Sequence, residues 1–140
     1  MNGSKEKVND WITIFNDHVE YENQSGCVFC PPSCFLDNAN EIITSSNLKL
    51  NLGSQDLDAD ANNPSTGGIN GKMLKELGCN YVLIGHSERR IHFNEHEDLL
   101  LKKLTSAVLN NLKVVYCVGE TKNQREQGVA TEVIKAQLQA

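Results

Sequence analysis

The residues best suited to chemistry lie in one short segment, residues 81–90, which reads Tyr-Val-Leu-Ile-Gly-His-Ser-Glu-Arg-Arg. An apolar strand and a glycine are followed by His86, and in parallel α/β folds ligands bind at the carboxyl ends of the strands. Ser87 and Glu88 begin a helical turn, whose positive end favours the neutral imidazole over the imidazolium. We therefore expect that His86 can donate a hydrogen bond to a substrate oxygen. A histidine that only satisfies hydrogen bonds at the strand end is the alternative interpretation.

Cys27, Cys30 and Cys34 form a second group of reactive side chains, with the spacing Cys-x-x-Cys-x-x-x-Cys. Structural zinc is bound by four such ligands in tetrahedral geometry, and no fourth ligand is evident nearby in the sequence. Cys27 and Cys30 also fall in a predicted strand, where residues three positions apart point to opposite faces. We therefore interpret them as buried, small apolar side chains rather than metal ligands.

Two further patterns are similar to metal sites but are incomplete. The acidic stretch at residues 56–62 resembles the first half of an EF-hand loop, but it lacks the glycine at the sixth position and the glutamate at the twelfth. His92 and His96 are four residues apart, as in a zinc site on a helix, but Glu95 precedes the second histidine instead of following the first. We expect a solvated acidic loop at residues 56–62 and no zinc site at His92 and His96.

The composition limits the classes of protein to which the chain can belong. Of its 140 residues, 39% are hydrophobic, which is enough for one compact domain with a continuous core. The net charge of −5 provides no positive surface for nucleic acid or anionic lipid, and no apolar run is long enough to span a bilayer. Five unevenly spaced cysteines are typical of free thiols in a reducing compartment, so a cytoplasmic location is expected.

Short strands that alternate with helices must position the candidate residues. Four runs rich in β-branched, aromatic or leucine residues are bounded by turn residues and predict strands at residues 27–30, 48–52, 81–84 and 114–118. Five helices are predicted around them: one near residues 8–19 capped by Ser4, one from about Phe35, one around Leu74 ended by Gly78, one from Glu97 ended by Asn110 or Asn111, and one from Thr131.

Helical spacing also predicts which side chains face the core. Apolar residues recur at intervals of three and four, so that one face of each helix is apolar. The predicted apolar faces contain Val8, Trp11, Ile12, Phe15 and Val19 in the first helix, Ala39, Ile42 and Ile43 in the second, Met73, Leu74 and Leu77 in the third, and Leu100, Leu101, Leu104, Val108 and Leu109 in the fourth.

The alternation of strands and helices predicts an α/β fold with a parallel sheet, because parallel neighbours need a crossover connection. Continuously apolar strands are expected to be buried on both faces. A doubly wound sheet and a (β/α) barrel both fit this pattern. The chain starts with a helix that has no preceding strand and stops within a helix, so we expect one domain, residues 1–140, that is truncated at both ends.

The segment Gly-His-Ser-Glu-Arg-Arg at residues 85–90 resembles the sequence around the electrophilic histidine of the triosephosphate isomerase family. Five further segments agree with that family in the same order along the whole chain. They are residues 1–4 after its first strand, Pro31 and Pro32 after its second, Gln55 at the end of its third, Thr66 and Gly67 in its interlocking dimer loop, and residues 115–120, with Cys117, in its fifth strand. The resemblance implies the eight-stranded (β/α) TIM barrel, here only the portion from the first helix to the fifth helix.

The resemblance also implies a reaction and roles for individual residues. The family interconverts dihydroxyacetone phosphate and D-glyceraldehyde 3-phosphate through an enediolate in glycolysis and gluconeogenesis, with no metal or organic cofactor. His86 would polarise the substrate carbonyl as the electrophile, and Glu88, Arg90 and Cys117 would support it from behind. From the charge pattern alone, Glu88 and Arg90 are instead expected to be solvated charges that open a short helix.

Some residues of the family's site have no counterpart in this sequence. By the resemblance, the asparagine and lysine that bind substrate precede the position of Met1, while the catalytic glutamate and the phosphate-binding loops follow that of Ala140. General acid–base catalysis requires these groups to be held together. We therefore expect this chain alone to be inactive. The alternative to a working isomerase is a catalytically inactive fragment of one.

The predicted dimer loop departs from the family pattern. Asp56 replaces an asparagine, residues 64–65 replace a small residue and an aromatic one, and Gly68 replaces a glutamate. The spacing that leads to Thr66 and Gly67 is preserved, so a homodimer of the full-length enzyme is still expected. Four parallel strands of an open barrel would also leave two edges unpaired, which predicts that the free chain associates or aggregates.

Overall fold

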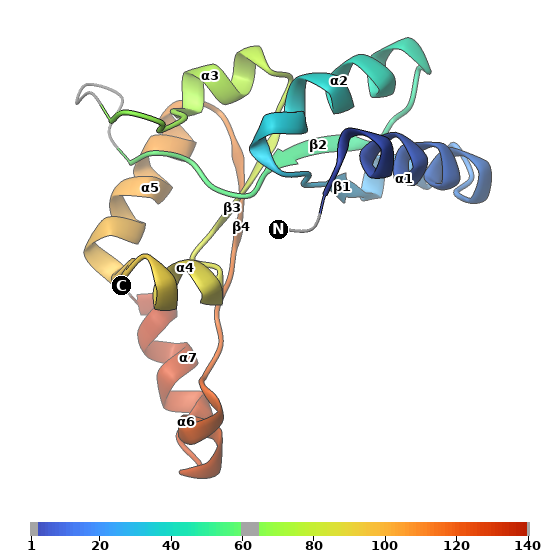
Figure 1. The fold of residues 1–140 in the computed structure, drawn as a ribbon. Helices are drawn as coiled ribbons and strands as arrows, with labels where there is room; N and C mark the ends of the chain where they lie inside the picture. The colour runs from blue at the N-terminus through green and yellow to red at the C-terminus, as the bar shows by residue number, and fades with distance from the viewer. Residues whose placement is uncertain (1–2, 60–64, 140) are drawn as a thin grey trace.

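A parallel four-stranded sheet forms the centre of the computed structural model, which describes residues 3–59 and 65–139 (Figure 1). The strands are β1 (Val28–Phe29), β2 (Asn51–Ser54), β3 (Tyr81–Ile84) and β4 (Lys113–Tyr116), and their order in the sheet is the same as their order in the chain. The register pairs Val28 with Asn51, Gly53 with Tyr81, and Tyr81 with Lys113. The predicted α/β fold with a parallel sheet is therefore confirmed.

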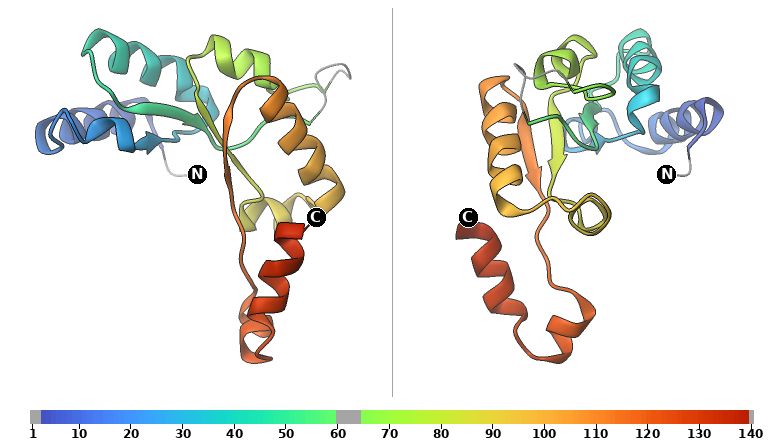
Figure 2. Two further views of the ribbon diagram at one scale, coloured as in Figure 1. Left: turned by 180° about the vertical axis from the view of Figure 1, so that it is seen from behind. Right: turned by 60° about the vertical axis from the view of Figure 1, so that its left-hand side comes forward.

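Helices connect consecutive strands, as crossover connections between parallel neighbours require. The α-helices are α1 (Lys5–His18), α2 (Leu36–Ser45), α3 (Gly71–Glu76), α4 (Ser87–His92), α5 (Glu97–Leu109), α6 (Lys122–Glu126) and α7 (Ala130–Gln139), and the 3₁₀ helices are η1 (Gln24–Gly26) and η2 (Ser33–Phe35). The five predicted helices correspond to α1, α2, α3, α5 and α7. Figure 2 shows that α6 and α7 lie beyond the end of β4, away from α1, α2 and α3.

The predicted helix ends are confirmed at three residues. The Ser4 side chain accepts a hydrogen bond from the Lys7 backbone N–H at 3.2 Å and caps α1. Gly78, with φ of +82°, ends the α3 segment, and Asn111, with φ of +54°, follows α5. Both lie in the left-handed region, which glycine and asparagine adopt at low cost.

The second strand starts three residues later than predicted and ends two residues later. Leu48 and Leu50 precede the ladder, which begins at Asn51 and includes Gly53 and Ser54, two residues with low strand propensity. A Cβ on Gly53 would lie 2.7 Å from Cys30 Sγ, so a side chain here would force Cys30 to shift. The position of this strand therefore depends on close packing between neighbouring segments, which strand propensity does not measure.

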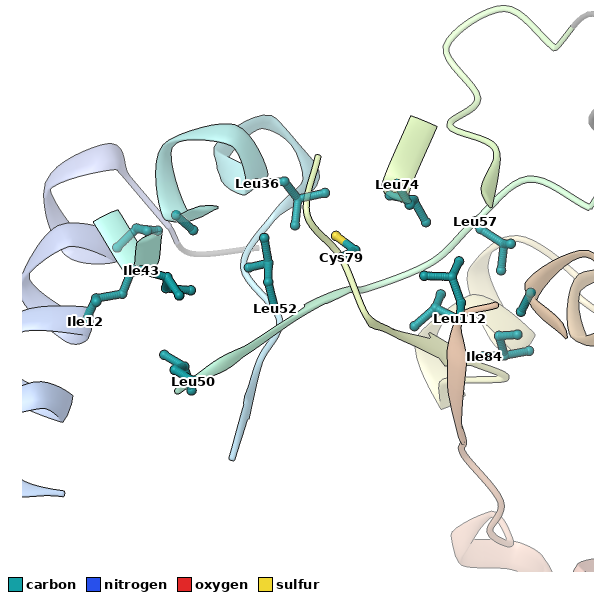
Figure 3. Close-up of a cluster of buried hydrophobic side chains, with 14 of the residues drawn as sticks. Ile12, Leu36, Ile43, Leu50, Leu52, Leu57, Leu74, Cys79, Ile84 and Leu112 are labelled. Carbon is teal, nitrogen blue, oxygen red and sulfur yellow. The ribbon is translucent and has the colours of Figure 1, made fainter. Parts of the chain in front are cut away.

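The apolar core lies between the sheet and the helices that pack against it (Figure 3). Its buried members include Ile12 of α1, Leu36 of α2, Leu52 of β2, Leu74 of α3, and Leu100 and Ala107 of α5. Five side chains predicted on the apolar faces are instead exposed, with exposed fractions of 42% to 78%: Trp11, Met73, Leu101, Val108 and Leu109. The prediction for these residues was wrong, because the buried stripe of each helix is narrower than its apolar face.

The strands are not all buried on both faces, which corrects a second expectation. In β3, Val82 and Ile84 are fully buried, whereas Leu83 is only half-buried. In β4, Val115 is 41% exposed. The helices pack against one side of these two strands, and the other side is left open.

Candidate active site

His86 lies at the carboxyl end of β3, where Gly85 turns the chain into α4. Gly85 has φ of +79°, and a Cβ there would lie 3.1 Å from the Cys117 carbonyl oxygen, so this turn requires glycine. His86 is the N-cap of α4, and its Nδ1 accepts a hydrogen bond from the Glu88 backbone N–H at 3.3 Å. An accepting Nδ1 carries no proton, which leaves the proton of a neutral ring on Nε2. The ring, 45% exposed, can therefore donate a hydrogen bond from Nε2 to a ligand.

Glu88 is a solvated charge at the start of α4, as the charge pattern predicts. Its side chain is 72% exposed, and its Oε2 lies 3.9 Å from His86 Nδ1. This contact is an ion pair only when the ring is protonated, and at such exposure an ion pair contributes little. The hydrogen bond from the Glu88 backbone N–H is therefore the stronger influence on the ring.

Arg90 is not solvated, which corrects the expectation from charge alone. Its side chain is 17% exposed and joins three elements. Its Nε donates to the Gly85 carbonyl oxygen at 2.8 Å, its Nη1 to Glu97 Oε1 at 2.6 Å, and its Nη2 to the Tyr116 hydroxyl at 3.1 Å. The hydrogen bond from Arg90 lowers the pKa of Glu97. Arg90 thereby ties the turn before His86 to β4 and to α5.

Cys117 directly follows β4 and contributes backbone atoms to this arrangement. Its N–H donates to the Ile84 carbonyl oxygen at 2.8 Å, and its own carbonyl oxygen accepts from Arg90 Nη2 at 3.4 Å. Burial raises the pKa of the Cys117 thiol, and the nearby Arg90 charge only partly opposes this. A thiol with a raised pKa is a poor nucleophile at neutral pH.

A pocket of about 570 Å³ lies beside His86. Besides His86, its walls include Trp11 of α1 and Phe29 of β1, whose rings stack with centroids 4.2 Å apart. Gln55, which follows β2, also lines the pocket and donates from Nε2 to the Cys30 carbonyl oxygen at 2.9 Å. The pocket therefore combines an apolar wall with polar groups from the carboxyl ends of β2 and β3.

The structure does not bring the predicted dimer-loop residues to this pocket. Thr66 and Gly67 lie in an exposed turn, in which the Gly68 N–H donates to the Ser65 carbonyl oxygen at 2.9 Å. Pro64, one of the predicted departures from the family, falls outside the described residues. Two other departures, Ser65 and Gly68, lie in this turn on either side of Thr66 and Gly67.

Four charged side chains form a cluster beside α4 that was not predicted from the sequence: Asp56, Arg89, Glu95 and Lys103. Glu95 and Lys103 are almost fully buried, with side chains 3% and 5% exposed. Asp56 is therefore part of an ion network, and its interpretation as a member of a solvated loop was wrong. Lys103 lies three residues after Leu100 and four before Ala107, so helical spacing could have indicated that it is buried.

Burial and pairing act against each other on the two carboxylates of this cluster. Burial raises the pKa of Asp56, although Lys103 and Arg89 oppose the increase. Burial also acts to raise the pKa of Glu95, but hydrogen bonds from Arg89 and Lys103 outweigh it, and the pKa is lowered. Pairing therefore outweighs burial at Glu95, whereas burial outweighs pairing at Asp56.

The described residues do not bring the suggested metal ligands together into one site. Within residues 3–59 and 65–139, no group of three or more His, Cys, Asp or Glu side chains could hold a metal ion. His92 ends α4, whereas His96 caps α5, so the two histidines do not share a helix face. Cys27 and Cys30 are half-buried, which is less than expected, and Cys34 is exposed. The calcium pattern includes residues 60–62, which lie outside the described residues.

Parallel strands with helical crossovers, and a histidine at the carboxyl end of a strand, place the chain in the α/β class, to which the (β/α) barrels belong. The family model described as triosephosphate isomerase matches residues 1–140, and the chain belongs to this family. It is 35% identical over 140 residues to triosephosphate isomerase of Vibrio vulnificus (strain YJ016) and 38% identical over 138 residues to that of Moorella thermoacetica. These alignments cover 100% and 99% of the chain, but only 55% and 54% of the relatives.

Solved structures agree with this assignment. The crystal structure of triosephosphate isomerase from Bartonella henselae matches with a TM-score of 0.85 at 32% sequence identity. The match covers 99% of this chain and 56% of that one, so the fold is a partial TIM barrel. The chain thus spans about half the length of the relatives it matches. In the described part of the chain, none of the helices has the length and apolar character needed to cross a membrane.

Proposed function

We propose that this chain supplies His86 to the interconversion of dihydroxyacetone phosphate and D-glyceraldehyde 3-phosphate within a complete triosephosphate isomerase barrel. The observation that carries the proposal is the hydrogen bond from the Glu88 N–H to His86 Nδ1 at 3.3 Å. It leaves an Nε2–H donor on a neutral ring beside the pocket, which is the form needed to polarise a carbonyl. Membership of the family supports the choice of substrate.

In the proposed reaction a carboxylate base removes a proton from C1 of the ketone, while His86 Nε2–H hydrogen-bonds the C2 carbonyl oxygen. The electron pair of the broken C–H bond forms the C1–C2 double bond of an enediolate, and the negative charge moves to that oxygen. The proton of the C1 hydroxyl is transferred through His86 to the C2 oxygen, and the base returns the abstracted proton to C2. The product is the aldehyde, and no net oxidation occurs. The base has no counterpart among the residues matched here, and the chain alone is therefore inactive.

We also propose how the complete enzyme assembles and where it acts. The complete enzyme is a cytoplasmic homodimer, to which Thr66 and Gly67 contribute an exposed turn. Glu88, Arg90 and Cys117 surround His86 at the carboxyl ends of β3 and β4, and Arg90 and Cys117 act by holding the turn at Gly85. The family resemblance supports these assignments, together with the exposure of the turn.

Complementation tests the proposal directly. The chain is combined with a polypeptide that supplies the missing part of a relative's barrel, and isomerase turnover is measured. We expect activity from the combination and none from the chain alone. His86→Asn should lower turnover by about 10²–10⁴-fold, whereas His18→Asn, which alters an exposed histidine on α1, should leave it unchanged. Activity of the chain alone, or full activity of the His86 variant, would contradict the proposal.

The second candidate is a catalytically inactive fragment, which the 55% coverage of the relatives favours. Intact mass spectrometry of the endogenous protein separates the two candidates. A species of 15.5 kDa supports the fragment. A species that corresponds to about 250 residues supports a complete barrel that contains this sequence.

A further inference from the structure

The short helix α4 is not held in place by apolar packing. None of its six residues, all of them described by the structure, has a buried side chain. Its position depends instead on two arginines. Arg90 bonds to Gly85, Glu97 and Tyr116, as described above, and Arg89 reaches the opposite way, into the cluster of Asp56, Arg89, Glu95 and Lys103.

Asp56 is the member of this cluster that presents both carboxylate oxygens to the two cations. Its Oδ2 lies 2.8 Å from Arg89 Nη2, and Lys103 Nζ donates to its Oδ1 at 2.6 Å and its Oδ2 at 2.8 Å. Glu95 uses Oε1 alone, which accepts from Arg89 Nε at 2.9 Å and Lys103 Nζ at 2.7 Å. Its Oε2 has no hydrogen-bond partner among the described residues. Without Asp56, Oε1 of Glu95 would be the carboxylate oxygen left to pair with both the buried Lys103 and the partly exposed Arg89.

The cluster is connected to His86 through the first turn of α4. The backbone N–H groups of Arg89 and Arg90 donate to the His86 carbonyl oxygen at 2.9 Å and 3.1 Å. The N–H that donates to His86 Nδ1 belongs to Glu88, the residue before Arg89. Any movement of the Arg89 side chain that unwinds this turn therefore withdraws the donor from Nδ1.

We propose that Asp56 is a positioning residue for His86: through Arg89 and Lys103 it holds the first turn of α4, so that the Glu88 N–H keeps the imidazole in its Nε2–H form. The functional meaning of this form rests on the proposed isomerase activity. Asp56 stands where the family resemblance predicts asparagine, which is neutral, so this chain balances two cations with two carboxylates.

Long-range ¹H–¹⁵N NMR of the labelled chain near pH 8 reports the tautomer of each histidine and tests the proposal. In the native chain we expect the Nε2–H form at His86. His18 is an internal reference with the opposite form, because its Nδ1 donates to the Ile14 carbonyl oxygen at 2.9 Å. In Asp56→Asn we expect a mixture of tautomers at His86 and no change at His18. Amide exchange of Arg89 and Arg90 should become about tenfold faster when the charge-assisted bond is lost.

A second variant allows for the unpaired charge that Asp56→Asn leaves at Lys103. Asp56→Asn/Lys103→Gln removes one carboxylate and one ammonium, so that Arg89 and Glu95 remain as a neutral pair. It should recover thermal stability relative to the single variant and still give mixed tautomers at His86. Glu126→Gln is the matched control, because it removes a carboxylate from an exposed ion pair with Lys122 and should change neither measurement.

An unchanged Nε2–H form with unchanged amide exchange in a folded variant would overturn the proposal. So would a native chain in which His86 has the other tautomer, or the loss of all folded structure in both variants, which would indicate a general role in stability. The measurement does not depend on turnover. If the tautomer responds as expected but the complemented barrel is inactive, the positioning role stands and the proposed function fails.

Discussion

Glu88 and Arg90 are separated by one residue in the sequence, yet the structure gives them opposite environments. Glu88 is 72% exposed, whereas Arg90 is 17% exposed and bonds to atoms of three separate elements. The charge pattern depends only on residues close together in the sequence, and it correctly predicts that Glu88 is solvated. It cannot predict Arg90, because the acceptors of Arg90 include Tyr116, which is distant in the sequence and adjacent only after β3 pairs with β4.

Replacement of Arg90 tests how much this junction contributes to stability. Arg90→Met removes the charge-assisted bonds to Gly85 and Glu97 and should lower the free energy of unfolding by about 2 kcal/mol. Urea denaturation measures the change. Lys122→Met is the control, since Lys122 is 90% exposed in its pair with Glu126 and its loss should change the free energy by less than about 0.5 kcal/mol. Equal losses in both variants would refute the role of Arg90.

We expect Cys79 to make the free energy of unfolding fall at alkaline pH. Burial raises the pKa of this fully buried thiol from 9.0 to about 11. The unfolded chain therefore loses the thiol proton at lower pH than the folded chain, and stability falls as the pH rises from 9 to 11. The full effect is about 2–3 kcal/mol.

Denaturant titrations at pH 8 and pH 10.5 measure this loss. Cys79→Ala should lose less stability between the two pH values than the native chain. Cys34→Ala, which alters an exposed thiol, should lose as much as the native chain. Some loss remains in the first variant, because burial also raises the pKa of Cys30 and Cys117. A Cys79 variant that loses as much as the native chain would contradict the assignment.

The helices and strands could be predicted wherever a local signal determines them. Ser4 caps α1 by a bond to a residue three positions away, and Gly78 and Asn111 adopt the left-handed conformation at helix ends. The bounds of β2 could not be predicted, because Gly53 lies where a Cβ would meet Cys30, which follows β1 and is distant in the sequence. Helix α6 was missed, although Thr121 and Gln124 form a capping box that the sequence Thr-x-x-Gln could have indicated.

Gly53 allows β2 to approach its neighbours closely, and Gly53→Ala tests this. The added Cβ would lie 2.7 Å from Cys30 Sγ, 3.1 Å from Val28 Cγ1 and 3.2 Å from Tyr81 Cβ. We expect a loss of about 1–3 kcal/mol in the free energy of unfolding, measured by urea denaturation. Gly26→Ala, whose Cβ would meet no atom within 4 Å, should stay within about 0.5 kcal/mol of the native chain.

A compensating change distinguishes steric contact from any other effect at Gly53. Gly53→Ala/Cys30→Ala removes the sulfur that the new methyl group meets. The double variant should be more stable than the sum of the two single changes predicts. Additive losses would show that Cys30 does not limit the approach of the two strands.

At the scale of the whole molecule, the sheet has β1 at one edge and β4 at the other, and neither edge pairs with a further strand among the described residues. Exposed apolar side chains lie at the β4 edge. They include Val115 in β4 and Val118, two residues after its end, which are 41% and 39% exposed. Unpaired strand edges beside exposed apolar surface promote association between chains. The match to about 56% of a barrel explains why both edges remain open.

We therefore expect the isolated chain to self-associate as its concentration rises, as measured by sedimentation velocity. Val115→Lys places a charge on the β4 edge and should weaken association, whereas Ile14→Lys, on α1, should have a smaller effect. Thermal unfolding should be poorly cooperative in the associated state. A monodisperse chain at all concentrations, with cooperative unfolding, would contradict this prediction.

The strands have the same order in the sheet as in the chain, and this order affects how the protein folds during synthesis. Each strand pairs with the next one to be synthesised, as Val28 pairs with Asn51 and Tyr81 with Lys113. Every pairing closes a loop of similar, moderate length, for which the entropic cost grows only slowly. The sheet can therefore be assembled one strand at a time as the chain leaves the ribosome. Each new strand finds the edge of the previous strand already in place, before its own helix has been synthesised.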